Sequence, residues 1–200
     1  MRARRATAED AEAYAAVIRA VAAERRWIGT EPPVDIGERA ARTREMLESG
    51  HALWVLEDDD GEVVGGLGLR GTGVRGVVAL GMAILAGARG RGGGRALMDA
   101  AILHLAGSDM HKVELEVWPD NGPAISLYAR YGFEVEGLRR NHYRRSDGTL
   151  RSSLIMARLL THPATEATEL SEASAATAEA AVTEPGAEAA DAQSRPGRGT

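Results

Sequence analysis

The chain has 200 residues, of which 44% are hydrophobic and 26% charged, with a formal net charge of −5. It contains no cysteine, which excludes disulfides, thiolate metal sites and a covalent acyl-cysteine intermediate. No apolar run has the length of a membrane span, the first residues lack the apolar core of a signal peptide, and the histidines show no metal-ligand spacing. We therefore expect a cytoplasmic globular protein with no membrane segment and no metal.

The net charge lies entirely in the last part of the chain. Residues 161–200 contain seven acidic and two basic side chains, are rich in Ala, Glu, Thr and Ser, and have no aromatic residue. Such a segment buries too little apolar surface to offset the entropy of ordering, so we predict a disordered acidic tail after a globular domain over residues 1–160. The domain itself is neutral and has no basic patch interleaved with aromatic residues, so nucleic acid is not an expected partner.

The first third of the chain predicts a strand, two helices and a β-hairpin. Thr7 with Asp10 and Asp35 with Glu38 each fit a helix-capping pattern, and the Asp-Gly at 60–61 indicates a tight turn. The expected elements are a strand over 2–6, a helix from Ala8 to about Glu24, a loop over Trp27–Val34, a helix from about 36 to Gly50, and strands over His51–Glu57 and Glu62–Leu69.

A glycine-rich loop follows the next strand. The apolar run Val77–Ala86 predicts a buried strand, residues 87–94 read GARGRGGG, and apolar residues at helical spacing follow up to Leu105. Strand, glycine loop and helix in this order are typical of phosphate sites, because glycines allow close backbone approach and the helix N-terminus adds positive charge. The alternative is a glycine-rich surface turn.

Two common phosphate motifs do not fit this loop. The dinucleotide fingerprint G-x-G-x-x-G fails, because its last position falls on Arg95 or Leu97. The P-loop motif requires a lysine within the loop, and the only lysine of the chain is Lys112. The ligand is therefore neither a classical dinucleotide nor a P-loop nucleotide.

The remaining residues predict a strand, a helix and a closing hairpin. Residues Lys112–Trp118 alternate as a half-buried strand, and Pro123 and Gly132 suit the first turn and the C-terminal cap of a helix over Asn121–Tyr131. Two further strands are expected over Phe133–Tyr143 and Ser152–Leu160, on either side of a turn at 146–148.

Two stretches resemble the GNAT acyltransferase superfamily. The pattern R-x-x-G-x-G is matched by Arg89, Gly92 and Gly94. The patterns E-x-x-x-x-N, A-x-x-L-Y and G-F are matched by Glu116, Asn121, Ala124, Leu127, Tyr128, Gly132 and Phe133. The resemblance runs over about residues 1–160. It implies an α/β protein with a mixed sheet, the GNAT fold, in the order β-α-α-β-β-β-α-β-α-β-β.

The resemblance also implies acetyl-coenzyme A (acetyl-CoA) as acyl donor. In the family the glycine loop wraps its pyrophosphate, and the pantetheine arm runs along the end of the central strand, here Met82, Ala83 and Ile84. Asn121 either contacts the pantetheine or caps its helix. The loop residues implied are Arg89, Gly90, Arg91, Gly92, Gly93, Gly94 and Arg95.

Two side chains are candidates for the proton transfers of amine acetylation. The attacking amine must lose a proton and the departing thiolate must gain one. In the ribosomal-protein-alanine branch of the family a glutamate and a tyrosine at the positions of Glu116 and Tyr128 act as base and acid. The alternatives from the residues alone are a solvated strand glutamate and a core tyrosine.

The final hairpin resembles the ribosomal-protein-alanine and phosphinothricin-type branch. Many relatives carry aspartate where this chain has Ser152 or Ser153, so no substrate role is transferred to the hairpin. A basic cluster there either forms a solvated face or selects a substrate with a carboxylate; it contains Arg139, Arg140, Arg144 and Arg145.

The sequence thus predicts an N-acetyltransferase that moves an acetyl group from acetyl-CoA to a primary amine in a ternary complex. The amine would be a protein N-terminus, an amino acid or a small amine, with Trp27–Val34 and Gly137–Gly148 shaping its pocket. The alternatives are a non-catalytic acetyl-CoA sensor and an interaction protein acting through its acidic tail. The expected assembly is a monomer or a homodimer.

Overall fold

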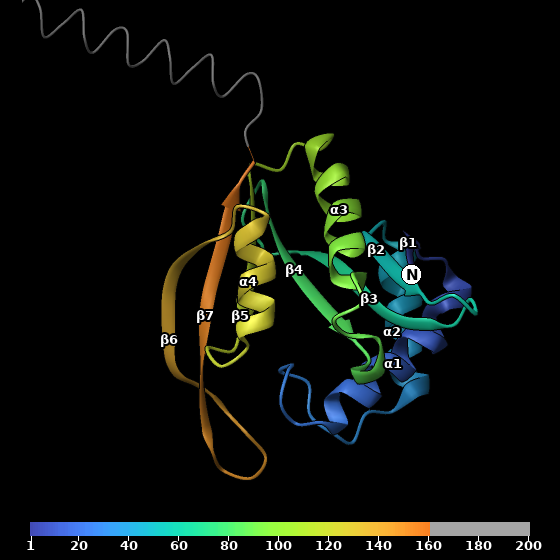
Figure 1. Cartoon of the computed structure of the whole chain (residues 1–200), viewed down its shortest axis with the longest axis horizontal. Coiled ribbons are helices and arrows are strands. Elements are labelled where there is room, and N and C mark those ends of the chain that lie inside the picture. Colours follow the sequence, from blue (N-terminus) through green and yellow to red (C-terminus); the bar gives the residue numbers. More distant parts are fainter. Residues whose placement is uncertain (161–200) are drawn as a thin grey trace, which may run out of the picture. The chain divides into compact units, whose positions relative to one another are not determined.

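Seven strands form one mixed sheet in the order β1-β2-β3-β4-β5-β7-β6 in a computed structural model of the protein (Figure 1). The structure describes residues 1–160, and the expected acidic tail lies outside the described residues. The strands are β1 (Arg2–Arg5), β2 (Leu53–Glu57), β3 (Val63–Gly71), β4 (Val77–Ile84), β5 (Lys112–Val117), β6 (Glu134–Arg144) and β7 (Leu150–Leu159).

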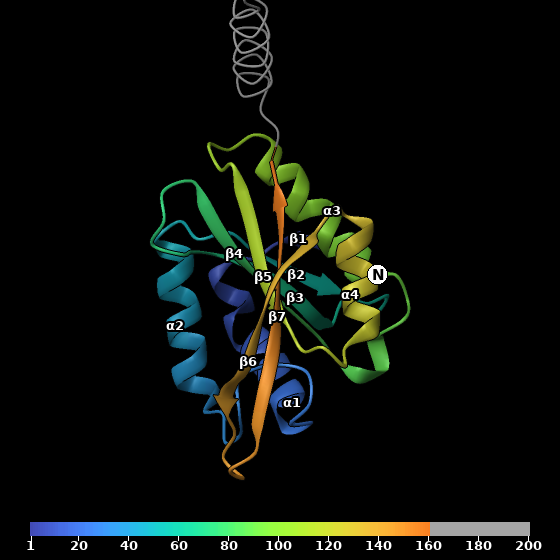
Figure 2. The same cartoon turned by 90° about the vertical axis from the view of Figure 1, so that its left-hand side faces the viewer.

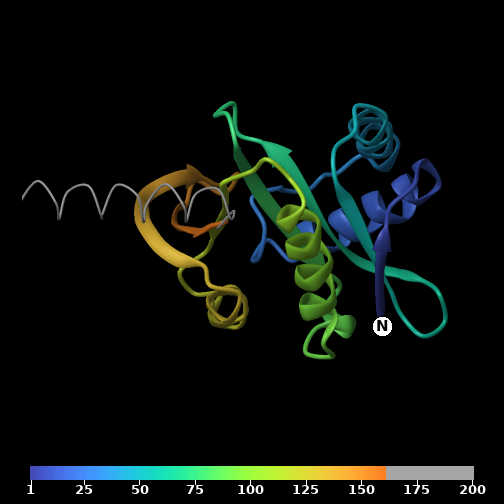
Figure 3. The same ribbon diagram turned by 90° about the horizontal axis from the view of Figure 1, so that it is seen from above.

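Helices cover both faces of the sheet. Figures 2 and 3 show α2 on the opposite side of the sheet from α3 and α4. None of the helices in residues 1–160 is long and apolar enough to span a membrane. The helices are η1 (Ala8–Asp10), α1 (Ala11–Ala23), α2 (Ile36–Glu48), η2 (Ala86–Ala88), α3 (Gly93–Ala106) and α4 (Gly122–Arg130), of which η1 and η2 are short 3₁₀ turns.

Strand β2 shows how the sheet serves two cores, because both of its faces are buried. On β2, Leu53 and Val55 pack in the apolar cluster that includes α1, whereas Trp54 and Leu56 pack in the larger cluster that includes α3 and α4. Because side chains alternate along a strand, one apolar run serves both cores. This arrangement fixes the α3 and α4 layer against the same sheet face.

The sequence predicted the element order correctly, and most boundaries moved by one or two residues. The helix expected from Ala8 begins as the 3₁₀ turn η1, in which the Asp10 carboxylate accepts a 2.7 Å hydrogen bond from the Thr7 amide. The strand expected to Ala86 ends at Ile84, because the chain turns into η2. The predicted α/β class with a mixed sheet is confirmed by this topology.

The central strands β4 and β5 part from one another along their length. They pair in parallel only over Val77–Ala79 and Lys112–Glu114, and Figure 1 shows them diverging toward their carboxyl ends. On its other side β4 stays paired with β3 as far as Ile84. The carboxyl half of β4 therefore presents one backbone edge to a gap within the sheet.

Candidate active site

A cavity of about 1000 Å³ lies where β4 and β5 separate. Its walls come from the carboxyl half of β4, the glycine loop with the start of α3, the end of β5, and α4. All of the predicted site residues except Arg91 and Gly93 line it. The structure thus brings together, in one cavity, residues predicted from two separate motifs.

The glycine loop carries the backbone features expected of an anion site. Gly90 and Gly92 have positive φ angles of 74° and 86°, a region that L side chains rarely adopt. Within the described residues, the amides of 90–94 donate to no protein acceptor, and they stand at the N-terminal end of the 14-residue helix α3. Free amides and a helix N-terminus together favour a phosphate group.

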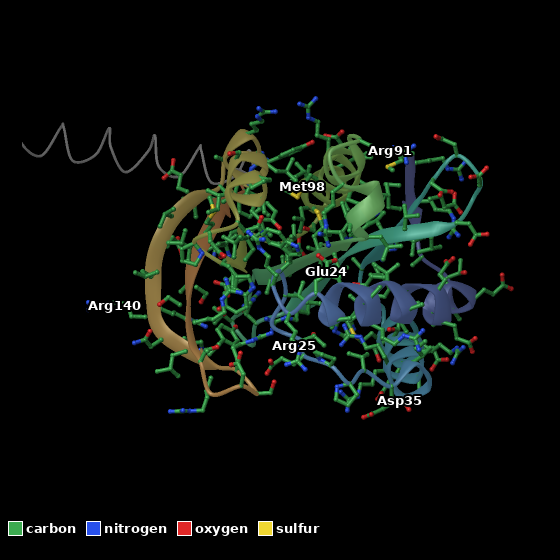
Figure 4. The ribbon with its side chains drawn as sticks, turned by 60° about the horizontal axis from the view of Figure 1, so that its bottom comes forward. Glu24, Arg25, Asp35, Arg91, Met98 and Arg140 are labelled. Atoms are coloured by element: carbon green, nitrogen blue, oxygen red, sulfur yellow. The ribbon has the colours of Figure 1, made fainter. Side chains whose placement is uncertain are left out.

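Two of the loop residues face away from the cavity. A Cβ atom on Gly93 would meet the side chain of Leu56, so this glycine allows α3 to pack closely on β2. Arg91 is exposed, labelled in Figure 4, and lies 3.4 Å from the Asp59 carboxylate. Their predicted contact with the cofactor remains a prediction.

Positive charge at this end of the cavity comes from two arginines on different helices. Arg95 stands in the first turn of α3 and Arg130 at the last residue of α4, and both line the cavity. Neither guanidinium forms an ion pair or hydrogen bond with another part of residues 1–160. Arg130 was missed by sequence reasoning, because only the packing of α4 beside the glycine loop brings it there.

Arg89 has a different environment from the other arginines of the loop. Its guanidinium forms a bidentate pair with Glu24, with nitrogen–oxygen distances of 2.6 and 2.8 Å. Its Nε atom donates to the carbonyl oxygen of Ile84 at 2.8 Å. The side chain predicted to contact phosphate is thus engaged with the end of α1 and the end of β4.

Glu116 lies near the carboxyl end of β5, lines the cavity and receives three hydrogen bonds. Arg139 donates to Oε1 at 2.6 Å, while Tyr143 and Ser153 donate to Oε2 at 2.9 and 2.8 Å. A carboxylate has about four acceptor positions, so about one remains for a ligand. The carboxylate is therefore held in one direction, although 29% of its side chain remains accessible to solvent.

The three donors to Glu116 come from the closing hairpin, β6 and β7. Tyr143 lies on β6 and also lines the cavity, as does Ser153, which is 1% exposed and buried on β7. The hydroxyl of Ser153 is neutral, so it can approach the carboxylate without charge repulsion. Sequence reasoning missed these partners, because their distance along the chain gives no signal of contact.

Tyr128 lies on the cavity-facing side of α4. Its ring packs 5.9 Å from that of Phe133, and 7% of the residue is exposed. Burial raises the pKa of its phenol to about 12, so the hydroxyl keeps its proton at neutral pH. A protonated phenol in a cavity can supply a proton to a leaving group.

Asn121 caps α4 and lines the cavity at the same time. Its Oδ1 atom accepts a 3.3 Å hydrogen bond from the amide of Ala124. The capping interpretation is thus confirmed, and the amide nitrogen of the side chain is left for a ligand.

The basic cluster of the hairpin divides into two pairs. Arg139 binds Glu116, and Arg145 is buried and donates to the carbonyl oxygen of Gly29 at 3.0 Å. Arg140 and Arg144 are exposed, and Figure 4 shows Arg140 projecting from the outer side of β6. The solvated-face interpretation therefore holds for two of the four arginines.

The loop expected to shape the acceptor pocket reaches the cavity. Trp27, Ile28 and Gly29 line it near the hairpin residue Tyr143. The loop is attached to the hairpin through Arg145 and through Ser146, whose amide donates to Glu31 at 2.9 Å. Both segments predicted to surround the acceptor therefore contribute to one wall of the cavity.

Comparison with known proteins identifies relatives of this site. Residues 17–133 match the model of the acetyltransferase (GNAT) family. The L-methionine sulfoximine/L-methionine sulfone acetyltransferase of Pseudomonas aeruginosa is 31% identical over 114 residues, which cover 55% of this chain. The match covers 66% of that relative, just under two thirds of its length.

Solved structures share the whole described fold. The ribosomal-protein-alanine N-acetyltransferase from Brucella melitensis is 25% identical with a TM-score of 0.73, over 80% of this chain and 100% of that one. A phosphinothricin acetyltransferase from Sinorhizobium meliloti, solved with AcCoA, is 22% identical with a TM-score of 0.72, over 79% of this chain and 87% of that one. The second likeness concerns the fold alone.

Proposed function

Since the chain belongs to the acetyltransferase (GNAT) family, we propose that it transfers an acetyl group from acetyl-CoA to a primary amine in a ternary complex. The observation that carries the proposal is the cavity between β4 and β5, which joins an anion-binding glycine loop to the Glu116–Tyr128 end. The similar proteins named above act on amino-acid or protein amines, and this supports an acceptor of that kind.

The residues present fit acetyl-CoA along the length of the cavity. The free amides of 90–94, with Arg95 and Arg130, suit its phosphates. The unpaired edge of β4 at Met82–Ile84 suits the amides of the pantetheine arm, which would add to the sheet as an extended chain does. The acetyl group would then reach the end of the cavity that holds Tyr128 and Glu116.

The proposed chemistry needs two proton transfers. The amine nitrogen attacks the thioester carbonyl carbon, a carbon–nitrogen bond forms, and the carbon–sulfur bond breaks to release the coenzyme A thiolate. Tyr128 supplies its phenolic proton to that sulfur, and Glu116 accepts the proton of the attacking amine, directly or through water. Before the next cycle Tyr128 regains a proton from solvent and Glu116 releases its proton to solvent.

The three donors around Glu116 give this carboxylate a second role. Because they occupy most of its acceptor positions, its remaining lone pair has one direction in which to receive a proton donor. An ammonium group held there would be both desolvated and oriented. Glu116 thus positions the acceptor as well as taking its proton.

The absence of cysteine supports a cytoplasmic location, which we also propose.

Acetyl-CoA binding and turnover test the proposal separately. Calorimetry should show binding of acetyl-CoA by the full chain, and Arg95→Ala and Arg130→Ala should each weaken it, more so at low salt. Free-thiol release over a panel of amino acids, N-terminal peptides and small amines should then identify an acceptor. No binding would contradict the site, and binding without turnover of any amine would favour the sensor alternative.

A further inference from the structure

Arg89 connects three segments that meet beside the cavity. Glu24 is the C-cap residue of α1, Ile84 is the last residue of β4, and Arg89 follows η2 at the start of the glycine loop. One guanidinium binds both of the others, through the bidentate pair and the Nε–carbonyl bond. Figure 4 labels Glu24 at the end of α1.

The segment that begins at Glu24 is the acceptor-side loop, residues 25–31. Its residue Trp27 lines the cavity, and its ring centroid lies 5.7 Å from the Arg89 guanidinium carbon, within the range of a cation–π contact. Ile28 and Gly29 follow and line the cavity as well. Arg89 thus fixes the start of this wall to the end of β4.

The side chains of the Arg89–Glu24 pair are partly shielded from solvent. The side chains are 33% and 29% accessible, and the pKa of Glu24 is lowered, chiefly by its hydrogen bonds with Arg89. A planar guanidinium can satisfy two carboxylate oxygens and a third acceptor together, whereas an ammonium group cannot match that geometry. This contact therefore depends on an arginine at position 89.

The same engagement makes Arg89 a poor phosphate ligand. Three of its five N–H groups are used, and its charge is matched by Glu24. Arg95 and Arg130 line the same cavity and have no acidic partner in residues 1–160. The charges available to phosphate are therefore those of the two other arginines.

We propose that Arg89 is a positioning residue for the acceptor side: by binding Glu24 and Ile84 it holds loop 25–31 against the cavity, and it does not serve as a cofactor ligand. The proposal rests on the proposed function, because it assigns this loop to the amine. It divides the R-x-x-G-x-G stretch into a glycine part for the cofactor and an arginine that serves the acceptor wall.

The test uses Glu24→Gln, Arg89→Met and the double variant, with Arg95→Met as the matched arginine control. We expect Glu24→Gln and Arg89→Met each to raise the KM for the amine about tenfold, and the double variant to raise it no further. Each should change kcat and the acetyl-CoA Kd by less than about twofold. Arg95→Met should do the opposite: it should weaken the binding of acetyl-CoA with little effect on the KM for the amine. Arg89→Lys should restore only part of the amine KM.

Hydrogen exchange makes the proposal independent of turnover. Amides of residues 25–31 should exchange faster in Glu24→Gln and Arg89→Met than in the unsubstituted protein and Arg95→Met, even if no amine acceptor is found. Unchanged exchange in these two variants would overturn the proposal while leaving the acetyltransferase function intact. If Arg89→Met weakened the binding of acetyl-CoA while Glu24→Gln had no effect, Arg89 would be a phosphate ligand and the proposal would be overturned.

Discussion

Tyr143 donates its phenolic proton to Glu116 Oε2 over 2.9 Å, which ties the edge strand β6 to the carboxyl end of β5 at the cavity. Burial, followed by this bond, raises the pKa of Tyr143, so it remains a donor at neutral pH. A second tyrosine therefore stands in the cavity besides Tyr128. Its role is different, because it orients the carboxylate and has no free proton to give away.

Replacing Tyr143 with Phe should loosen Glu116 without removing it. We expect kcat/KM for the amine to fall roughly 10-fold, which is about the loss of one hydrogen bond to a charged group. The acetyl-CoA Kd should be unaffected, as calorimetry would show. If the double variant of Tyr143→Phe and Glu116→Gln loses no more than Glu116→Gln alone, Tyr143 acts through Glu116, whereas additive losses would separate the two roles.

Glu116→Gln should lower the rate most at low pH. The amide keeps the shape of the side chain but cannot accept the proton of the amine, so the defect should shrink as rising pH supplies neutral amine. Rate profiles from about pH 6 to pH 10 would show this trend. The control is Glu114→Gln, two residues earlier on β5 and outside the cavity lining. A defect that is constant across pH would leave Glu116 with positioning alone.

Tyr128→Phe removes only the proposed acid. The ring and its packing on Phe133 stay, so we expect an unchanged acetyl-CoA Kd and a kcat lower by roughly 10²–10⁴-fold. With its pKa near 12, Tyr128 should not itself cause a loss of activity with rising pH up to about 10. Tyr131→Phe is the control, because that hydroxyl donates to Asp99 at 2.6 Å, outside the cavity lining. Full kcat in Tyr128→Phe would assign the acid to another group or to solvent.

Gly92→Asn tests the glycine loop with little backbone strain. Asn tolerates the left-handed conformation that the φ of 86° requires, so the fold should persist while the new side chain obstructs phosphate. We expect acetyl-CoA affinity to fall at least about tenfold. Gly148→Asn, at a φ of 85° in the β6–β7 turn, should change stability similarly but leave affinity intact. Equal affinity in both variants would remove the phosphate from this loop.

The ion pair between Arg4 and Asp10 should make the free energy of unfolding depend on pH in the acidic range. Arg4 binds Asp10 at 2.7 and 2.8 Å, and these bonds are the main cause of the lowered pKa of the buried Asp10. A lowered folded-state pKa stabilises the fold above the unfolded value of about 3.9, and this stabilisation is lost as pH falls through the folded value. Asp10→Asn should therefore cost about 1–3 kcal/mol of unfolding free energy at pH 7 and much less near pH 2. Urea unfolding at both pH values would measure it, and an equal loss at both would refute the electrostatic origin.

Much of the fold could be read from local patterns. The apolar run from Val77 and the helical spacing up to Leu105 each depend on residues close in sequence, and both elements formed where expected. The motifs also selected residues that share one cavity, although they lie in different elements. The motifs of the family therefore indicated which residues lie close together, although the sequence of one chain does not show this directly.

The side-chain contacts of the motif residues could not be predicted from the sequence. The contact of Arg89 with Glu24 and that of Glu116 with Ser153 depend on side-chain directions across the sheet, which neither periodicity nor charge specifies. Arg89 shows the consequence: its motif position indicated phosphate, and its strongest contacts are with a carboxylate at the far end of α1. A charged residue in a motif is best assigned after its competing partners are known.

The parting of β4 and β5 has a consequence for how the protein unfolds. Within residues 1–160, the strands of the β1–β4 half pair with those of the β5–β7 half at three residue pairs, next to backbone hydrogen bonds from His111 and Lys112 to Gly76. A pantetheine arm lying on the open edge of β4 would contact both halves of the sheet. Bound acetyl-CoA would therefore connect two parts of the sheet whose own strand pairing is short. Cooperativity of melting, and not only its midpoint, should then rise when acetyl-CoA is added.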